Sequence, residues 1–374
     1  MKIRGQEVLL PTKMLGAYVN PRWYDSTAAT YNLPFGELLE DAYETEVFED
    51  AVATVIHDQE RAGLDVIVDA RVFAAGSYAK VVAYYIGRLS GYVPYGPYLP
   101  FPLYSTLFSP NLVGPVKRAV PIMTPIAKVV KKHTSKPVQI QYTATGTLAN
   151  ISNDLYYKKP RDRAMAIAEA LNEDIQEVDA LGVEFIQLDE WFWPYTFEAW
   201  SIDAFNRTVE GIKNAKIIVH LCIGNYMGGR GYHQDDTAVP GKEPFILYQR
   251  KGDYLDYASV IPKAYNAKID ILNMQVIEEM DLAVLEALKK HPLPAHLDLW
   301  VGVIDVKSTY VETAEEVAAR IRRVLQVVPP EKVGLTVGCG FKNMNRLMAF
   351  QKLRALVEGT NLVRNELTGK KKVA

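Results

Sequence analysis

The segment Lys216-Ile-Ile-Val-His-Leu-Cys222 is a strand-length apolar run that ends in a histidine and a cysteine two residues apart. Alternate side chains of a β-strand share a face, so His220 and Cys222 can reach one ion together. The only other cysteine, Cys339, follows a second apolar run that begins at Val333. Imidazole and two thiolates suit zinc, and three protein ligands leave one position open for a substrate. The alternative is that both cysteines are core residues.

The amino-acid composition is sufficient for one large hydrophobic core. It has 374 residues, 49% of them hydrophobic, and a net charge of −2, which allows one α/β barrel or two smaller domains. The near-neutral charge predicts binding to neither nucleic acid nor an anionic membrane. The apolar runs are too short to cross a membrane, and the N-terminus lacks the apolar core of a signal peptide. We therefore expect a cytoplasmic protein with reduced thiols, with one disulfide as the alternative.

Strand-like apolar runs alternate with segments of helical period along the chain. The expected strands are 14–18, 65–69, 138–143, 184–189, 216–222, 270–275, 297–305 and 333–339. The expected helices include 164–181, 281–290 and 314–328, and the last opens with a capping-box pattern from Thr313 to Glu316. This alternation predicts a single (β/α)8 TIM barrel with a short N-terminal extension and a lid-like insertion between strands 5 and 6.

Polar residues end several of these strands. The active sites of such barrels lie at the C-terminal ends of the strands. The residues found there are Asp189, Glu190, His220, Cys222, Gln275 and Cys339. Core cysteines placed at random would not gather with them at one rim, so the pattern predicts a zinc site with one ion per chain.

Three further segments carry expectations with open alternatives. The insertion around 228–236 is interpreted as a lid in which His233 or Tyr232 donates a proton, or else as a surface loop. Asp189 is expected to orient a ligand or contact the substrate. The aromatic run that begins at Trp191 is expected to wall an apolar pocket or to pack in the core, and residues 365–374 are expected to form a solvated tail.

Several motifs together resemble one enzyme family. They are Leu10-Pro-Thr-Lys-Met-Leu-Gly-Ala-Tyr18, Phe185-Ile-Gln-Leu-Asp-Glu190, His220-x-Cys222, Asp305-Val-Lys-Ser308 and Val337-Gly-Cys-Gly-Phe-Lys342. They are similar to the catalytic barrel of cobalamin-independent methionine synthase across nearly the whole chain. The resemblance implies a zinc ion that holds a thiol substrate as its thiolate and presents it to an alkyl donor. It also implies a single catalytic domain, 1–374, without the second barrel of full-length methionine synthases.

Three departures from the family pattern concern the thiol. The glutamate ligand of the sixth strand is replaced by Gln275, with Asn273 or water as alternatives for the fourth ligand. The acidic residue that holds an amino group after the second strand is replaced by Arg71, and a serine of the entry segment is replaced by Ala17. A cation in place of an amine anchor favours a thiol that carries a negative charge.

Coenzyme M, a thiol sulfonate without an amine, meets that requirement. Within this superfamily, the short epoxyalkane:coenzyme M transferases use it to open an aliphatic epoxide, and this is the predicted activity. The alternatives are methyl transfer to homocysteine or another thiol, and a metal-free binding protein on the same scaffold. The oligomeric state stays open, a homo-oligomer included. The predicted substrate-binding residues are Ala17, Tyr18, Arg71, Glu190, Trp191 and Lys342.

Overall fold

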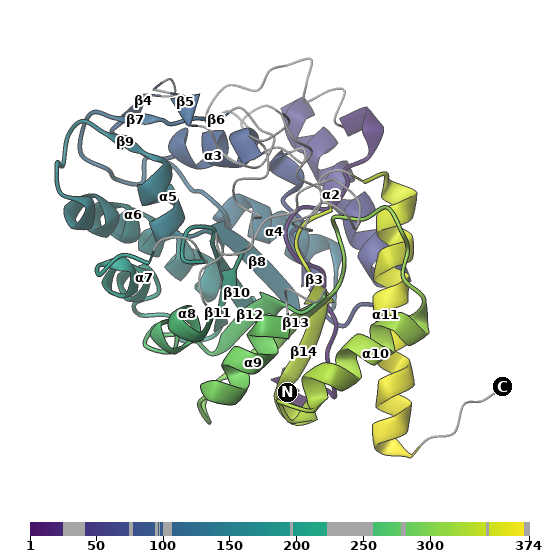
Figure 1. Ribbon diagram of the computed structural model, residues 1–374. Coiled ribbons are helices and arrows are strands. Elements are labelled where there is room, and N and C mark those ends of the chain that lie inside the picture. Colours follow the sequence, from purple (N-terminus) through teal and green to yellow (C-terminus); the bar gives the residue numbers. More distant parts are fainter. Residues whose placement is uncertain are drawn as a thin grey trace, which may run out of the picture.

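A curled sheet of parallel strands surrounded by helices forms the body of the protein in this computed structural model (Figure 1). The structure describes residues 1–24, 42–74, 78–93, 96, 98–99, 107–194, 197–222, 257–277, 282–341 and 344–369. Seven strands make the sheet, in the order β14-β13-β12-β11-β10-β8-β3. Their bounds are β3 Ile67–Val68, β8 Val138–Thr143, β10 Phe185–Glu190, β11 Lys216–Leu221, β12 Ile271–Gln275, β13 Asp298–Ile304 and β14 Val333–Val337. The predicted barrel fold is confirmed, with seven of the eight expected strands in place.

The prediction of a regular strand at 14–18, which would complete the set of eight, is wrong. A single parallel bridge joins Thr12 to Leu335 of β14, and the carbonyl of Thr12 accepts from the amides of Asp65 and Val66 just before β3. The chain then turns at Gly16, which has φ of 67°, and the Gly16 amide donates to the Gln141 side chain at 2.7 Å. Residues 11–13 thus close the barrel between β14 and β3. Beyond them, the Gln141 side chain takes the place of a backbone partner on a neighbouring strand.

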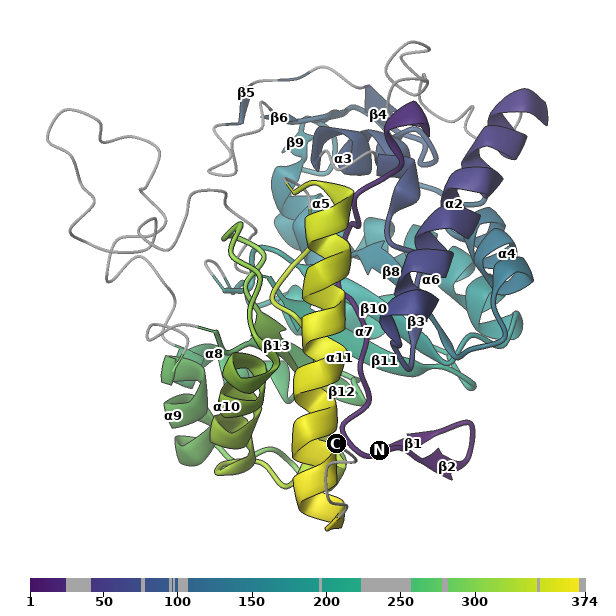
Figure 2. The same cartoon turned by 90° about the vertical axis from the view of Figure 1, so that its right-hand side faces the viewer.

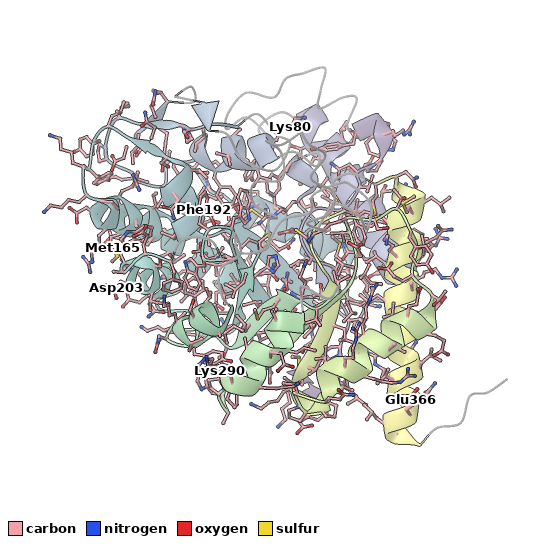
Figure 3. All side chains as sticks on the ribbon, viewed as in Figure 1. Lys80, Met165, Phe192, Asp203, Lys290 and Glu366 are labelled. Carbon is pink, nitrogen blue, oxygen red and sulfur yellow. The ribbon has the colours of Figure 1, made fainter. Side chains whose placement is uncertain are left out.

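Helices cover the outside of the sheet. They are α2 Ala42–Ala62, η1 Val72–Ala74, α3 Tyr78–Ile86, α4 Thr124–His133, α5 Thr145–Ile151, α6 Pro160–Ala180, α7 Ser201–Thr208, α8 Tyr257–Ala264, α9 Leu282–Lys290, α10 Ala314–Leu325, η6 Pro330–Lys332 and α11 Arg346–Thr368. The capping box predicted at Thr313 is present, with its hydroxyl accepting from the Glu316 amide and the Glu316 side chain accepting in return. Exposed acidic side chains such as Asp203 and Glu366 project from this layer (Figure 3).

Short strands lie at the two ends of the barrel. The hairpin of β1 Lys2–Ile3 and β2 Gln6–Glu7 lies at the N-terminal end of the large strands (Figure 2). There Met1 and Ile3 pack with Val66, Phe185 and Trp300 and plug the barrel. The remaining strands are β4 Tyr92–Val93, β5 Tyr98–Leu99, β6 Leu107–Phe108, β7 Asn111–Leu112 and β9 Asn153–Asp154. Because the hairpin seals one end, an active site has to open at the other.

Two segment predictions meet the limits of the described chain. Helix α11 continues to Thr368, so the first four residues of the expected tail 365–374 are helical, and 370–374 lie outside the described residues. The insertion expected as a lid, 228–236, lies outside them as well. None of the helices in the described ranges is long and apolar enough to cross a membrane.

Candidate metal centre

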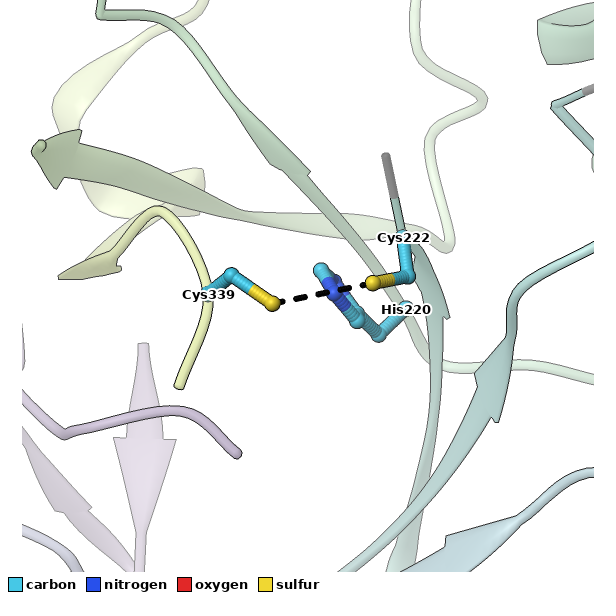
Figure 4. A group of neighbouring side chains, drawn as sticks. All are labelled: His220, Cys222 and Cys339. Carbon is cyan, nitrogen blue, oxygen red and sulfur yellow. Dashed lines mark hydrogen bonds between the residues drawn. The ribbon is translucent and has the colours of Figure 1, made fainter. Parts of the chain in front are cut away.

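His220, Cys222 and Cys339 come together at the C-terminal rim of the barrel. His220 lies near the end of β11, Cys222 follows that strand, and Cys339 lies two residues past β14. Their ligand atoms all lie within 4.8 Å of one another, and the side chains point toward one another (Figure 4). All three residues are buried, with exposed fractions of 2%, 6% and 7%. The structure therefore joins two segments that are 117 residues apart in the chain.

The geometry of the three residues fits a tetrahedral ion. The two sulfur atoms are 3.7 Å apart, and two thiolates at the usual zinc–sulfur distance of about 2.3 Å in a tetrahedral site are separated by about 3.8 Å. The two cysteines are not joined in a disulfide. The hydrogen bond with Cys222, and then the neighbouring His220 ring, hold the pKa of the Cys339 thiol well below its usual range in spite of burial. The thiolate form that a metal requires is thus favoured before an ion is considered.

The histidine is oriented by a neighbouring strand. His220 Nδ1 lies 2.8 Å from Asn273 Oδ1, and because a carbonyl oxygen accepts, Nδ1 carries the proton. His220 Nε2 is buried and has no hydrogen-bond partner among the described residues, so its lone pair remains available. Metal-binding histidines are usually held in this way through their second nitrogen. Asn273, an alternative fourth ligand, thus contacts His220 through its oxygen.

Gln275 stands at the end of β12, next to the cysteine turn. It is 3% exposed, and its Oε1 would lie 3.0 Å from a methyl group added to Gly338, the residue before Cys339. This places an amide oxygen beside the turn that carries Cys339. Its role as the fourth ligand stays a prediction.

Arg71 enters the barrel from a left-handed turn after β3. Ala70 and Arg71 both have positive φ, 58° and 48°, which costs about 1 kcal/mol or more for each residue. The turn is held by the Arg71 amide, which donates to Asp69 Oδ1 at 3.0 Å. The guanidinium donates to Asp189 Oδ2 at 2.7 Å, and both side chains are 5% exposed. Strained backbone at this position therefore aims a cation at the site.

The electrostatic surroundings connect Arg71 with the metal ligands. Burial tends to lower the pKa of Arg71, but the negative charges of Asp189 and Cys222, among others, raise it above its usual value. Arg71 Nε is buried and makes no hydrogen bond within the described chain. Arg71 is thus paired with a carboxylate. The Nε–H group of its guanidinium nevertheless remains available to donate a hydrogen bond.

A polar layer fills the barrel below the rim. Lys13 is fully buried, donates to Gln139 and, at 2.8 Å, to Gln187, and lies 4.7 Å from the centre of the Trp300 ring. Burial lowers its pKa well below the usual value. Gln187 also donates to Asp189 Oδ1 at 2.7 Å. This layer orients Asp189, which in turn orients Arg71.

Four other predicted substrate-binding residues, Ala17, Tyr18, Glu190 and Trp191, are described by the structure. The Ala17 carbonyl accepts from Phe341 at 2.7 Å, and the buried Tyr18 donates to Asp58 at 3.3 Å. The Glu190 carboxylate accepts from the Gly146 amide at 3.2 Å and the Thr147 hydroxyl at 3.3 Å. The Trp191 amide donates to Thr147. The predicted roles of these residues in substrate binding stay predictions, and Lys342, Tyr232 and His233 lie outside the described residues.

Sequence reasoning named Asp189, His220 and Asn273 at this end of the barrel but missed Thr143, which lies in the same row. Thr143, Asp189, His220 and Asn273 lie in one row across four adjacent strands. The Thr143 hydroxyl is buried and has no hydrogen bond to any described residue. Polar residues at alternate positions of 139–143 and 187–189 are the signal that could have predicted this polar interior. Lys307, which follows β13, was also assigned no role.

The fold and this site define the class of protein. The chain matches the model of the family "Cobalamin-independent synthase, Catalytic domain" over residues 10–223 and 253–361, and it belongs to that family. It is thereby an enzyme, and the resemblance seen in its motifs is confirmed. The first matched region includes β11 and the second includes β14, the two strands that lead to the candidate ligands.

Individual relatives narrow the comparison. The chain is 50% identical over 379 residues to a 2-hydroxypropyl-CoM lyase of Xanthobacter autotrophicus, with 100% of both chains covered. It is 31% identical to a methionine synthase of Saccharolobus solfataricus, with 97% of each covered. Among solved structures, a B12-independent methionine synthase from Shewanella sp. W3-18-1 in complex with selenomethionine matches with a TM-score of 0.77 and 26% identity, covering 97% of this chain and 100% of that one.

Proposed function

We propose that the protein is a zinc-dependent epoxyalkane:coenzyme M transferase, which joins the thiol of coenzyme M to an aliphatic epoxide. The observation that carries the proposal is the 50% identity, over the whole of both chains, to a 2-hydroxypropyl-CoM lyase. The candidate centre of His220, Cys222 and Cys339 supports it, because the reaction needs a thiolate. We further propose a single catalytic unit in the cytoplasm, with one zinc per chain and no nucleic-acid or membrane partner.

The ion would be held by one imidazole nitrogen and two thiolates, with Gln275 or water in the remaining position. The orphaned Nε2 of His220 and the 3.7 Å separation of the sulfur atoms support this assignment. When bound, zinc ionises a coordinated thiol at neutral pH. Asn273 keeps His220 in the tautomer that can coordinate it.

Arg71 is proposed to hold the sulfonate of coenzyme M. Its Nη2 contacts Asp189 and its buried Nε has no partner in the described chain, so the donor fork can serve a second anion. The polar layer of Gln187 and Lys13 keeps Asp189, and through it Arg71, in place. A planar guanidinium suits an oxyanion, and a charge-assisted contact of this kind is worth about 1.5–3 kcal/mol.

The reaction joins two molecules without a net change of protons. The thiolate sulfur attacks the less hindered epoxide carbon, the carbon–sulfur bond forms and the carbon–oxygen bond breaks. The electron pair of the broken bond goes to oxygen, which takes up a proton and becomes the hydroxyl of the 2-hydroxyalkyl thioether. Ring strain drives the opening, so the chain has to align the reactants and supply the proton. Tyr232 and His233 stay predicted donors.

Methionine synthase is the second candidate, favoured by the family and by the 31% identity to a methionine synthase of Saccharolobus solfataricus. In this activity the thiol is homocysteine and the alkyl group is a methyl group. The ammonium group of homocysteine would lie next to the Arg71–Asp189 pair. The carboxylate of this pair is already engaged by Arg71 and Gln187. That arrangement favours an anionic thiol, although it leaves one carboxylate near the site.

The activity test compares two thiols and two donors. Purified zinc-loaded protein is incubated with coenzyme M or homocysteine, each with epoxypropane or a methyl donor, and loss of free thiol is followed. We expect reaction of coenzyme M with epoxypropane. Methyl transfer to homocysteine without epoxide opening would establish the second candidate. Cys222→Ala and Cys339→Ala should each lose most of the zinc, and full retention of zinc in both variants would refute the metal centre.

The role of Arg71 is tested with a thiol that lacks the sulfonate. Coenzyme M and 2-mercaptoethanol share the thiol and the two-carbon chain, so their difference in affinity reports the anion. We expect Arg71→Gln to weaken coenzyme M by about 10- to 100-fold and to leave 2-mercaptoethanol nearly unchanged. Equal losses for both thiols would mean that Arg71 acts on the fold and does not recognise the sulfonate.

A further inference from the structure

Thr143 is the last residue of β8, and its side chain faces the interior of the barrel. Two earlier residues of the strand show which face this is. Gln139 accepts from Lys13 in the polar layer, and Gln141 donates to Asp69 Oδ1 at 2.8 Å. Because alternate side chains of a strand share a face, the Thr143 side chain points the same way, one step nearer the rim.

The strand register places Thr143 in the row of the candidate site. Thr143 pairs with Asp189 of β10, and Asp189 pairs with His220 of β11. Asp189 Oδ2 in turn accepts from Arg71 Nη2 at 2.7 Å. The hydroxyl of Thr143 therefore lies beside the carboxylate that holds the guanidinium group, one strand farther from the candidate metal ligand.

The turn that carries Arg71 is also tied to β8 directly. Asp69 Oδ2 accepts from the Gln141 amide at 2.7 Å, while Asp69 Oδ1 accepts from the Arg71 amide at 3.0 Å. One carboxylate thus joins the strand that ends in Thr143 to the turn that aims Arg71. The two residues are held at the same corner of the barrel from both sides.

Two buried donors at this corner have no acceptor within the described residues. They are Thr143 Oγ1 and Arg71 Nε, on residues that are 0% and 4% exposed. Other buried threonines do use their hydroxyls: Thr147 donates to the Asp189 carbonyl at 3.2 Å, and Thr360 donates to the Leu356 carbonyl at 2.7 Å. A buried donor without an acceptor is costly. Both donors are explained by an acceptor that arrives with the substrate.

The number of donors points to the kind of acceptor. A guanidinium group meets an oxyanion with two parallel N–H groups. This satisfies the two oxygens of a carboxylate, whereas a sulfonate has three oxygens around a tetrahedral sulfur atom. One sulfonate oxygen is then left without a donor, and a hydroxyl group beside the arginine supplies it.

We propose that Thr143 is a specificity-determining residue whose hydroxyl donates to the sulfonate oxygen that Arg71 leaves without a donor. This inference rests on the proposed function, which supplies coenzyme M as the thiol. Arg71 attracts any anionic thiol, and Thr143 favours the sulfonate over a carboxylate on the same two-carbon chain. Specificity of this kind is a difference between two affinities, so it is measured with matched ligands.

The test uses three thiols that share the same two-carbon chain. Coenzyme M carries a sulfonate, 3-mercaptopropionate carries a carboxylate, and 2-mercaptoethanol carries neither. Titration calorimetry measures their affinities for zinc-loaded wild type, Thr143→Val and Thr143→Ser. We expect Thr143→Val to bind coenzyme M about 10-fold or more weakly, and to bind the other two thiols nearly as wild type does. Thr143→Ser keeps a hydroxyl group and should retain the affinity of wild type for coenzyme M.

Thr360→Val is the matched control, because it makes the same substitution at a buried threonine of α11 whose hydroxyl serves its own helix. It should bind all three thiols as wild type does, and all variants should hold the same amount of zinc. Equal losses for the three thiols in Thr143→Val, or equal affinities of Thr143→Val and Thr143→Ser for coenzyme M, overturn the role of Thr143. Failure of the proposed function is seen separately, as wild type that leaves epoxypropane unopened in the presence of coenzyme M.

Discussion

Each candidate side chain of the rim is held by a second contact behind it. Asn273 holds His220, and Asp189 together with Gln187 surrounds the end of Arg71. Such outer contacts fix the orientation of a metal ligand or an anion-binding group before the substrate arrives, so less ordering remains to be done on binding. The site is therefore organised by the strands that carry these partners.

Asn273→Ala tests the outer contact to the histidine. Without Oδ1 the Nδ1–H group of His220 loses its hydrogen-bond acceptor, so the ring can rotate and change its tautomer. We expect zinc affinity to fall by about 10- to 100-fold, because outer contacts of metal-binding histidines have effects of this size. Competition with a chromogenic chelator measures it. Affinity equal to that of wild type would show that packing alone orients His220.

Glu190 predicts a dependence of stability on pH. Burial raises its pKa to about 8, above the ordinary value of 4.5 that the unfolded chain would show. Between these values the folded state holds more protons than the unfolded state, so stability is greatest below about pH 4.5 and falls as the pH rises toward 8. A shift of this size corresponds to a loss of up to about 5 kcal/mol.

Glu190→Gln should remove most of that loss. The amide keeps an acceptor for the Gly146 amide and can donate to the Thr147 hydroxyl. Urea unfolding at pH 5 and pH 9 measures the difference, with Glu358→Gln, about half exposed on α11, as the control. The variant should lose less stability than wild type on going from pH 5 to pH 9. Parallel pH profiles for wild type and Glu190→Gln would contradict the prediction.

Among the elements, β13 and β14 approach unusually closely near the candidate metal centre. A methyl group added to Gly302 would lie 2.7 Å from Gly338 Cα and 2.8 Å from the Val337 carbonyl. Both neighbours are backbone atoms, which cannot turn aside as a flexible side chain can. The position of Cys339 therefore depends on a strand pair that tolerates no side chain at this point.

Gly302→Ala should push the two strands apart. We expect a loss of about 1–3 kcal/mol in the free energy of unfolding, as for other overpacked sites, together with weaker zinc binding because Gly338 and Cys339 shift. Gly114→Ala is the matched control, since its added methyl group meets its nearest neighbour at 3.5 Å. Chemical unfolding and zinc titration measure both effects. Equal stability of the two variants would show that the strands can separate without cost.

Most elements could be predicted from local patterns. Strands such as 138–143 and 184–189 alternate apolar and polar side chains over most of their length, and α10 carries its own start signal at Thr313. The segment 14–18 has a strand-like composition, but its amides find partners far away in sequence, such as the Gln141 side chain for Gly16. No local pattern reports a partner 125 residues away.

In the whole molecule, the candidate metal centre connects two sides of the barrel. Its ligands come from β11 and from the turn after β14, and β12 and β13 lie between these strands. An ion at this point ties the ends of non-adjacent strands, so its binding free energy adds to the stability of the folded state.

Removal of the metal should therefore lower the melting temperature. For a ligand at 100 times its dissociation constant the stabilisation is about 2.7 kcal/mol, which corresponds to a few degrees in a protein of this size. Calorimetry of zinc-loaded and chelator-treated protein measures the shift, and one equivalent of zinc should restore it. The Cys339→Ala variant should show no response to the chelator. A shift of equal size in that variant would place the responsible ion elsewhere.

The sequence by itself determined the strand and helix pattern, the family and the residues that can bind a metal, because these depend on the period of side chains and on short motifs. Only the tertiary structure decided which groups share the rim. The hydrogen bond of Asn273 to His220 and the pairing of Arg71 with Asp189 both depend on distances between separate strands. The curling of the sheet sets those distances, and local sequence carries no record of them.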